Sequence, residues 1–370
     1  METDKEQRRL NISRAGKAKA VALLSGGLDS TLAILVMLRQ GIDVTAITFL
    51  THFGCDITDS SSCSRNPMPV AKEFGFRVKL SHLADKFIEI VKNPGFGHGK
   101  NMNPCIDCRI LMLREAKVFM DLIGADFLVT GEVLGQRPMS QRKECFPLVD
   151  REAGVEGLVL RPLSAKLLPP TMAELKGLVD REYLHDFNGR TRRPQMNLAA
   201  ELGLTDYPSP AGGCLLTEPS YACRLRDLLK YNSTPGLTEL HLLRVGRHFR
   251  TSPEFKIIVG RNEAENEKII ALASSEDTLM SVEDIGSPTT IITGRVSDNE
   301  IMTAASLTAR YSDAKHLSHV EVTVSTLRGI SYKLMCIPAT DDLIEGCRVA
   351  DGKILAGQPS KESVCLSKTQ

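Results

Sequence analysis

Apolar, β-branched runs alternate with runs of helical period along the first 130 residues of the chain. The predicted strands lie at 18–24, 44–50, 76–80 and 125–130, and the predicted helices at 31–38, 69–74, 84–91, 105–123 and, further on, near 171–180 and 194–203. Strands that alternate with helices in this way build a parallel sheet with helices on both faces. We therefore predict an α/β fold with a doubly wound parallel sheet.

A stretch rich in proline and glycine interrupts this pattern at 204–220, with the sequence LTDYPSPAGGCLLTEPS. Stretches of this composition favour domain boundaries. Beyond it, strands are predicted at 240–245, 255–259, 289–292 and 320–324, with helices near 261–273 and 299–310. The prediction is a flexible segment over 1–18, an α/β domain over 19–218 and a smaller α+β domain over 219–370.

The overall composition is that of a globular protein with a real core, with 370 residues, 42% hydrophobic residues and a net charge of +1. The charge balance excludes a polybasic chain, so any nucleic-acid surface is local. No signal peptide is recognised, and no apolar run reaches the ~18 residues needed to cross a membrane. We expect a cytoplasmic protein whose ten cysteines stay reduced and serve metal binding or catalysis rather than disulfides.

The loop Ser-Gly-Gly-Leu-Asp-Ser joins the first predicted strand to the first predicted helix. Gly26 and Gly27 let the backbone turn sharply and approach an anion, and the helix start offers N–H groups without intrahelical partners. Ser25 and Ser30 add hydroxyl donors, and Asp29 is a ligand for Mg²⁺ or orients the loop. A tight turn capped by an Asp or Ser side chain is the alternative. The position at the carboxyl end of a strand favours a phosphate site.

The same hexapeptide resembles the PP-loop of ATP pyrophosphatases, which cleave ATP between its α and β phosphates and adenylate a substrate oxygen. It lacks the lysine of a Walker A loop. The resemblance implies that ATP binds at Ser25, Gly26, Gly27, Asp29 and Ser30, with Mg²⁺ bridging its phosphates.

Three cysteines form a second candidate site. Cys105 and Cys108 open the long predicted helix as a C-x-x-C pair, and Cys214 follows the loop Pro-Ala-Gly-Gly. A pair at a helix start is a redox couple, half of a zinc site or part of an iron–sulfur site. With Cys214 added, the set suits a [4Fe–4S] cluster with one open iron, or a redox pair with a separate nucleophile. The alternative is that Cys214 is a small buried residue.

The motifs NPCIDC, GADFLVTGE and SPAGGCLLTEP resemble the tRNA-specific 2-thiouridylases over about residues 18–217. The run Thr130–Gln136, TGEVLGQ, followed by Ser140-Gln141 and by Arg161-Pro162-Leu163, resembles the 4-thiouridine synthetases more closely. Glu132 and Gln136 follow the fourth strand, where ligand-facing loops lie in such folds.

These resemblances imply ATP-dependent thiolation of a tRNA uridine, with 4-thiouridine slightly favoured over 2-thiouridine. They imply catalytic roles for Asp29, Cys105, Cys108 and Cys214, with the three cysteines as cluster ligands or sulfur carriers. They also imply a nucleotide contact at Gly131 and a sulfur donor, which is a cysteine desulfurase or free sulfide.

Basic residues cluster around two predicted strands of the second domain. The runs HLLRVGRHFR and KIIVGRNEAENEKI resemble the NFACT-R domain, a proposed RNA-binding module, over about residues 237–345. Arg244, Arg247, Arg250 and Arg261, interleaved with Phe249 and His248, suit phosphate contacts and base stacking. A solvated charged edge is the alternative.

Two other functions remain open at this stage. One is a PP-loop ligase or sulfur transferase that acts on a small molecule, and the other is a non-catalytic RNA-binding protein with a degenerate nucleotide fold. Among the remaining cysteines, only Cys63 is a weak candidate for the site, and no oligomeric state is predicted.

Overall fold

The computed structural model describes residues 18–53, 66–209, 214–293 and 297–350. The chain divides into two compact units, Met1–Glu218 and Pro219–Gln370, and each is described by itself. None of the helices in the described ranges is both long and apolar enough to cross a membrane.

The N-terminal unit is built on a five-stranded sheet with the order β3-β2-β1-β4-β5. The strands are β1 (Lys19–Leu23), β2 (Asp43–Leu50), β3 (Arg77–His82), β4 (Phe127–Thr130) and β5 (Val159–Leu160). Every neighbouring pair is parallel. The central strands are buried on both faces, as their continuous apolar runs predict. The predicted doubly wound α/β fold is confirmed.

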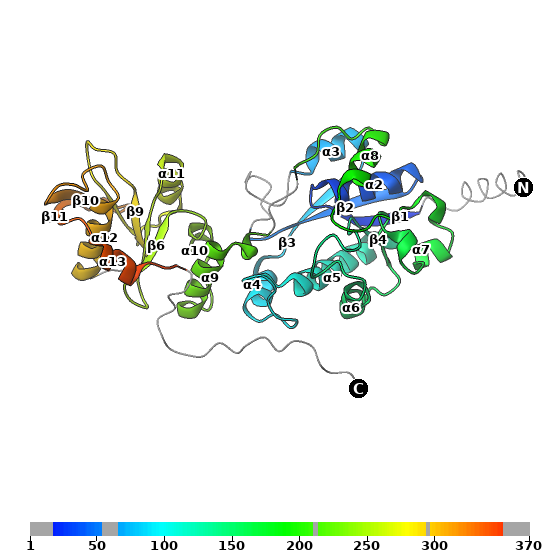
Figure 1. Cartoon of the computed structure of the whole chain (residues 1–370), viewed down its shortest axis with the longest axis horizontal. Helices are drawn as coiled ribbons and strands as arrows, with labels where there is room; N and C mark the ends of the chain where they lie inside the picture. Colours follow the sequence, from blue (N-terminus) through cyan, green and yellow to red (C-terminus); the bar gives the residue numbers. More distant parts are fainter. Residues whose placement is uncertain (1–17, 54–65, 210–213, 294–296, 351–370) are drawn as a thin grey trace, which may run out of the picture. The chain divides into compact units, whose positions relative to one another are not determined.

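Helices cover the two faces of this sheet (Figure 1). On one face lie α2 (Leu28–Arg39), α3 (Met68–Phe74) and α8 (Arg193–Glu201). On the other lie α4 (Ala84–Lys92), α5 (Cys105–Ile123) and α6 (Cys145–Ala153). Because α2 is covered by the sheet and by α8, Leu32, Ile34 and Met37 are all fully buried.

The order of the strands places a switch point between β1 and β4. From β1 the chain adds β2 and β3 in one direction, whereas β4 and β5 lie in the other. The loops that leave adjacent strands on opposite sides of such a point form a crevice at the carboxyl edge of the sheet. The loop 24–27 follows β1 and the loop from Gly131 follows β4, so both meet at this crevice.

Smaller elements complete the unit. The region predicted as helical near 171–180 contains only α7 (Met172–Leu175), which starts with a capping box of Thr171 and Glu174. Short 3-10 turns follow at Arg181–Tyr183 and Leu215–Thr217, and another precedes α7 at Ala165–Leu167.

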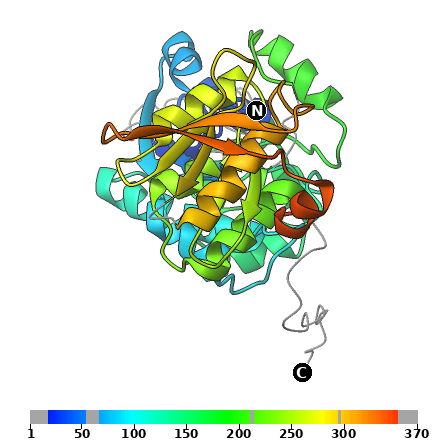
Figure 2. The ribbon, with the colours of Figure 1, turned by 90° about the vertical axis from the view of Figure 1, so that its left-hand side faces the viewer.

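The C-terminal unit contains a six-stranded antiparallel sheet with the order β11-β10-β8-β9-β7-β6. The strands are β6 (Arg247–Arg250), β7 (Lys256–Val259), β8 (Thr278–Ser281), β9 (Thr290–Thr293), β10 (Val320–Thr326) and β11 (Ser331–Cys336). Figure 2 shows this unit from the side on which β10 and β11 (orange) face the viewer. The smaller α+β unit expected from the sequence is therefore present.

Both faces of this second sheet are covered. Helix α12 (Asp298–Arg310) packs on the face that includes Phe249 and Ile257, together with α13 (Asp341–Cys347). Helices α10 (Leu237–Leu242) and α11 (Glu263–Leu272) pack on the face of Ile258. Helix α9 (Pro219–Tyr231) opens the unit.

The predicted strand at 240–245 is wrong. Residues 237–242 form α10, and the strand β6 starts only at Arg247. The carboxylate of Glu239 accepts a hydrogen bond from the backbone N–H of Gly236 (2.9 Å), which fixes the helix start. Gly246, with a φ of 72°, then turns the chain into the strand. The apolar run was compatible with a strand or a helix. The bond from Gly236 to Glu239 and the turn at Gly246 favour the helix.

Candidate nucleotide and thiol site

The loop between β1 and α2 has the geometry of a phosphate-binding turn. Gly26 has a φ of 74°, a conformation that favours glycine. The hydroxyl of Ser30 donates to the backbone carbonyl of Gly27 (2.9 Å) and lies 3.1 Å from the hydroxyl of Ser25. The first turn of α2 therefore points its N–H groups toward the crevice, with Ser25 exposed beside them.

Gly131 lies against the backbone of this turn. A Cβ atom at position 131 would be 2.4 Å from the backbone nitrogen of Ser30 and 2.5 Å from the carbonyl carbon of Asp29. Only glycine allows β4 to end this close to the start of α2. The residue predicted as a nucleotide contact thus has a packing role that holds the two loops together.

Asp29 is a half-buried carboxylate at the centre of the crevice. Its Oδ2 accepts a hydrogen bond from Nε2 of Gln136 (3.0 Å), while its Oδ1 has no hydrogen-bond partner among the described residues. Burial raises the pKa of Asp29, and Gln136, Arg192 and Arg137 act against this rise. The carboxylate therefore keeps one buried oxygen that is available to a cation or a donor.

Gln195 is a residue of this crevice that the sequence did not reveal. It lies in the first turn of α8, is 1% exposed and acts on the carboxylate of Asp29. Neither its amide oxygen nor its amide nitrogen makes a hydrogen bond of good geometry within the described part of the chain, although its side chain is near enough to Asp29 to lower the pKa of that carboxyl. Gln136, by contrast, belongs to the TGEVLGQ motif, which had pointed to it.

A buried cluster of charged side chains supports the loop after β4; we call Arg109, Glu132, Asp150 and Arg161 the Glu132 cluster. Oε2 of Glu132 accepts from Nε of Arg161 (3.0 Å), and Oε1 lies 3.3 Å from Nε of Arg109. Arg161 also donates two bonds to Asp150, at 2.9 and 2.7 Å. The Glu132 cluster fixes the residue next to Gly131 and ties β4 to α5 and α6.

The charges of the Glu132 cluster balance. Burial raises the pKa of Glu132, but Arg109 and Arg161 outweigh this effect and the net shift is downward. Burial lowers the pKa of Arg161, but Glu132 and Asp150 reverse the shift. Both guanidinium groups and Glu132 therefore stay ionised in a buried position, whereas burial raises the pKa of Asp150 despite its two bonds to Arg161.

Cys105 and Cys108 lie in the first turn of α5, directly after Pro104 at its N-terminus. Sγ of Cys105 donates to the hydroxyl of Ser140 (3.3 Å), which belongs to the loop after β4. Both thiols are close enough to Arg109 to act on its pKa. The pair thus lies beside a guanidinium group, on the helix that packs against β1 and β4.

Cys214 is carried by a segment that pairs with the loop before α5. The backbone N–H of Met102 donates to the carbonyl of Leu216 (3.1 Å), and the side-chain amide of Asn101 donates to the carbonyl of Thr217 (2.7 Å). These bonds bring the segment that begins at Cys214 to the entrance of the helix that starts with Cys105. Cys214 is itself half-buried.

No group of three His, Cys, Asp or Glu side chains suited to hold a metal ion occurs within the described ranges. Cys105, Cys108 and Cys214 as placed do not form the ligand set of a [4Fe–4S] cluster, which stays a prediction. Asp29 fits Mg²⁺ better, because Mg²⁺ bound with ATP takes one or two carboxylate oxygens and the phosphates.

The other cysteines have surroundings separate from the site. Cys145 is buried and donates to the carbonyl of Met139 (2.9 Å). Cys223, Cys336 and Cys347 are buried in the C-terminal unit. Cys55, Cys63 and Cys365 lie outside the described residues.

The four arginines predicted to bind RNA make contacts within the C-terminal unit. Arg250 donates two bonds to Asp227 (2.7 and 2.9 Å) and is largely buried. Arg247 donates to the carbonyl of Gly260 (3.1 Å) and lies over the ring of Tyr311. Arg261 pairs with Glu265, and Arg244 is half-buried. Among Arg247, Arg250 and Arg261, the side chain of Arg261 is the most exposed, at 43%.

Two family models match the chain. Residues 15–166 match the family described as "Thiamine biosynthesis protein (ThiI)". Residues 246–346 match the family described as "NFACT protein RNA binding domain". One match covers the sheet and both loops of the crevice, and the other covers most of the second sheet.

The curated relatives are similar over part of their length. The bifunctional protein NifU/MnmA of Rubrobacter xylanophilus is 29% identical over 139 residues, which are 35% of this chain and 28% of that protein. The tRNA-specific 2-thiouridylase MnmA of Leptospira interrogans is 26% identical over 136 residues, which are 31% of this chain and 34% of that protein. The chain thus spans about a third of the length of these relatives.

Among solved structures, a 4-thiouridine synthetase in complex with RNA and bound ATP is 21% identical and covers 50% of this chain and 52% of that chain, with a TM-score of 0.31. The family matches and the motifs define the class. The N-terminal unit is similar to PP-loop domains of the thiouridine synthetase type, and the C-terminal unit is similar to NFACT-type RNA-binding domains. The resemblance inferred from the sequence is confirmed.

Proposed function

We propose that this chain thiolates a uridine of tRNA at the expense of ATP. The N-terminal unit adenylates a carbonyl oxygen of the base and transfers sulfur to the same carbon, and the C-terminal unit contacts the RNA. The proposal joins the ThiI-family match, the curated relatives named as tRNA-specific 2-thiouridylases and the NFACT match.

One observation carries the proposal: a continuous path of contacts links the nucleotide loop to a thiol. Asp29 bonds Gln136 in the loop after β4, and Ser140 of the same loop bonds Cys105. This path supports a site in which the group activated at Asp29 lies near the thiol of Cys105, which releases the product in the second step proposed below.

The first step is adenylation. The N–H groups at the start of α2 and the hydroxyl of Ser25 hold the phosphates, while the hydroxyl of Ser30, which donates to the carbonyl of Gly27, fixes the turn. Asp29 would hold Mg²⁺, which would neutralise charge on the phosphates. The uridine oxygen attacks the α-phosphorus, the bond to the β-phosphate oxygen breaks, and pyrophosphate leaves. The base oxygen is then part of a good leaving group, AMP.

The second step moves sulfur. The terminal sulfur of a persulfide on Cys214 attacks the ring carbon, the bond between carbon and oxygen breaks, and AMP leaves. The thiol of Cys105 or Cys108 then attacks the Sγ of Cys214, which releases thiouridine and leaves a disulfide. Free sulfide reloads Cys214 by attack on this disulfide. Alternatively, a dithiol reduces the disulfide and a cysteine desulfurase transfers new sulfur.

The ring position proposed is C4. The TGEVLGQ motif and the ThiI-family match support 4-thiouridine, whereas the curated relatives are named for 2-thiouridine. Chromatography of digested tRNA against both thionucleoside standards distinguishes the two products.

The central test is Cys214→Ser in the full chain, with ATP, a sulfur source and unmodified tRNA. We expect the thiolated nucleoside to disappear, while ATP binding and pyrophosphate release remain. Cys347→Ser is the matched control, because its buried thiol donates only to the carbonyls of its own helix and the serine hydroxyl can replace it. Full thiolation by Cys214→Ser would contradict the proposed role of this residue.

A second function, sulfur transfer to a small molecule, is supported by the description of the matched family as a thiamine biosynthesis protein. The internal contacts of Arg247 and Arg250 also reduce the number of cations offered to RNA. Binding of tRNA to the full chain over a range of salt concentrations separates the two functions. An affinity for tRNA that falls as the salt concentration rises supports tRNA thiolation. No measurable affinity for tRNA supports sulfur transfer to a small molecule.

A further inference from the structure

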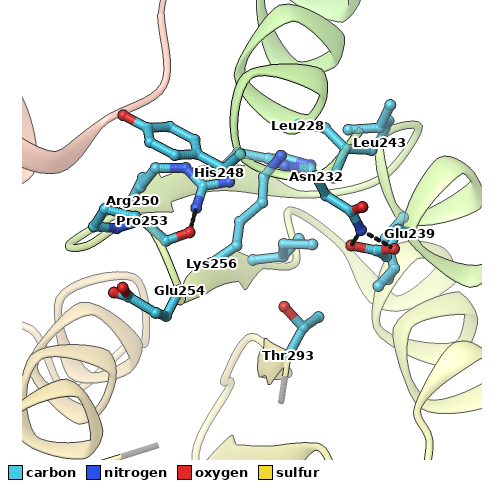
Figure 3. A pocket seen from close by; sticks show the side chains of 13 residues that line it. Leu228, Asn232, Glu239, Leu243, His248, Arg250, Pro253, Glu254, Lys256 and Thr293 are labelled. Atoms are coloured by element: carbon cyan, nitrogen blue, oxygen red, sulfur yellow. Dashed lines mark hydrogen bonds between the residues drawn. The ribbon is translucent and has the colours of Figure 1, made fainter. Parts of the chain in front are cut away.

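A cavity of about 260 Å³ lies in the C-terminal unit between the sheet and helices α9 and α10 (Figure 3). The strands contribute polar side chains, among them His248 on β6, Lys256 on β7 and Thr293 on β9. The helices contribute apolar side chains such as Leu228 and Leu243. We call this cavity the Lys256 pocket. None of its residues belongs to the nucleotide and thiol site.

Lys256 has spare donor capacity in this pocket. Its side chain is 8% exposed, and its Nζ lies 3.2 Å from Oδ2 of Asp227. No acceptor within the described ranges takes a hydrogen bond of good geometry from this Nζ. Asp227 already accepts two hydrogen bonds from Arg250. Two cations therefore share one carboxylate, and an ammonium group with three protons is incompletely paired.

His248 offers an acceptor beside this donor. Its Nε2–H donates to the backbone carbonyl of Val245 (2.8 Å), which leaves Nδ1 as the acceptor nitrogen. Burial, together with Lys256, lowers the pKa of His248 well below its usual value, so the ring is neutral. Nδ1 is buried and has no hydrogen-bond partner in the described part of the chain. Figure 3 shows the Lys256 side chain extending from β7 toward His248.

The rest of the lining disfavours a phosphate. Glu239 and Glu254 line the pocket with carboxylates, and Glu239 accepts from the amide of Asn232 at 3.1 and 2.9 Å. Leu243 and Ile258 add apolar walls. Arg250 also lines the pocket, but its guanidinium already donates two bonds to Asp227. A doubly charged anion would therefore meet two carboxylates and a cation that is already paired, whereas an uncharged ring with its own donors and acceptors would meet complementary groups.

We propose that the Lys256 pocket binds a single nucleobase from an unpaired stretch of RNA, with Lys256 as donor and His248 as acceptor to its edge. The inference rests on the proposed function, in which the C-terminal unit contacts RNA. Sequence-specific RNA recognition uses unpaired bases whose edges are hydrogen-bonded by side chains. The cavity lies just below the ~300 Å³ at which pockets for drug-sized ligands begin, so it suits one ring system rather than a whole nucleotide.

The test compares two probes on the full chain: a single-stranded RNA oligonucleotide and an abasic oligonucleotide with the same number of phosphates. Lys256→Met removes the ammonium and keeps the length of the side chain. Lys268→Met is the matched control, because Lys268 is exposed on α11 of the same unit. Thr293→Val removes a second polar group from the pocket without changing its size.

We expect Lys256→Met to weaken binding of the base-containing RNA at least tenfold, as expected for loss of a charge-assisted hydrogen bond. Binding of the abasic probe should change less than about twofold, the change expected of a residue that contacts no phosphate. Thr293→Val should act in the same direction with a smaller effect. Lys268→Met should affect both probes equally.

Two results would overturn the inference. If Lys256→Met weakens both probes equally, Lys256 contacts phosphate rather than a base. If it weakens neither while wild type binds the RNA, the pocket does not take a base and the proposed RNA contact of the unit stands. Failure of the wild-type chain to bind either probe would count against RNA binding by this chain and against the pocket together. Thermal melting of each variant shows that the fold is retained.

Discussion

Each unit buries a group of charged side chains, and the two groups are built differently. In the Glu132 cluster, two arginines face two carboxylates, and every charge has a partner at 2.7–3.3 Å. In the C-terminal unit, Arg250 and Lys256 share Asp227. In the Glu132 cluster, the carboxylates raise the pKa of Arg161 in spite of its burial. In the C-terminal unit, burial lowers the pKa of Lys256 to about 8 in spite of the nearby Asp227.

The difference indicates that the Glu132 cluster has a structural role, whereas the Lys256 group can take part in binding. A buried ion pair contributes little net stability when complete, but the loss of one partner leaves an uncompensated charge. The Glu132 cluster is complete and holds the loop between Gly131 and Ser140 in place. The Lys256 group is incomplete, so it keeps an amine that a ligand can pair. Three experiments test this contrast.

Glu132→Gln should have the largest effect, because it leaves the Arg161 guanidinium, which is 4% exposed, with half of its pairing. We expect the free energy of unfolding to fall by about 3–5 kcal/mol, measured by chemical denaturation. Glu144→Gln, which breaks the exposed pair with Arg142, should cost less than about 1 kcal/mol. Equal effects of the two substitutions would remove the contrast.

Lys256→Met should be more stable than wild type at pH 7, with a difference that disappears at high pH. Below pH 8 the lysine is protonated in both states, and the folded state carries the full cost of burying the charge. Between pH 8 and 10.5 the unfolded chain keeps the proton that the folded chain loses, so wild-type stability rises with pH. The shift from 10.5 to about 8 corresponds to about 3 kcal/mol.

The measurement is the difference in free energy of unfolding between the two proteins from pH 7 to pH 10.5. Taking the difference removes the titration of other groups. Lys268→Met, at an exposed position of α11, is the control. A difference that stays constant for Lys256→Met would show that the ammonium is well solvated or fully paired.

Gln195→Leu should have the smallest effect on the free energy of unfolding. It tests whether the N-terminal unit also contains a buried polar group that is available to a ligand. We expect ATP affinity to fall about tenfold, the loss of one hydrogen bond to a charged group. The free energy of unfolding should stay equal or rise, because a buried amide without partners is removed. Met196→Leu, at the exposed neighbouring position, is the control. Unchanged ATP affinity would mean that Gln195 does not act on the nucleotide.

Local patterns predicted much of the N-terminal unit. The strand–loop–helix around Asp29 and the helix start at Cys105 lie where the sequence placed them, because glycine turns, proline and apolar periodicity act within a few residues. The strand predicted at 240–245 failed because its apolar run suited a short helix as well as a strand.

Tertiary pairing was beyond the reach of the sequence. Arg250 resembled an exposed phosphate ligand until Asp227, 23 residues earlier, was found beside it. Gln195 lies 166 positions from Asp29, and no motif connects them. The sequence placed Lys256 only within the strand predicted at 255–259, and the packing of the C-terminal unit makes it a buried amine.

The pairing of Asn101 and Met102 with residues 216 and 217 has a consequence for how the protein is made. The contact closes a loop of more than a hundred residues, and contacts of such separation form late in folding. A chain emerging from the ribosome completes the nucleotide loop early and the surroundings of Cys214 last. We expect the growing chain to become able to bind nucleotide before it can carry sulfur at Cys214, so truncated products ending before residue 214 would lack sulfur-transfer activity.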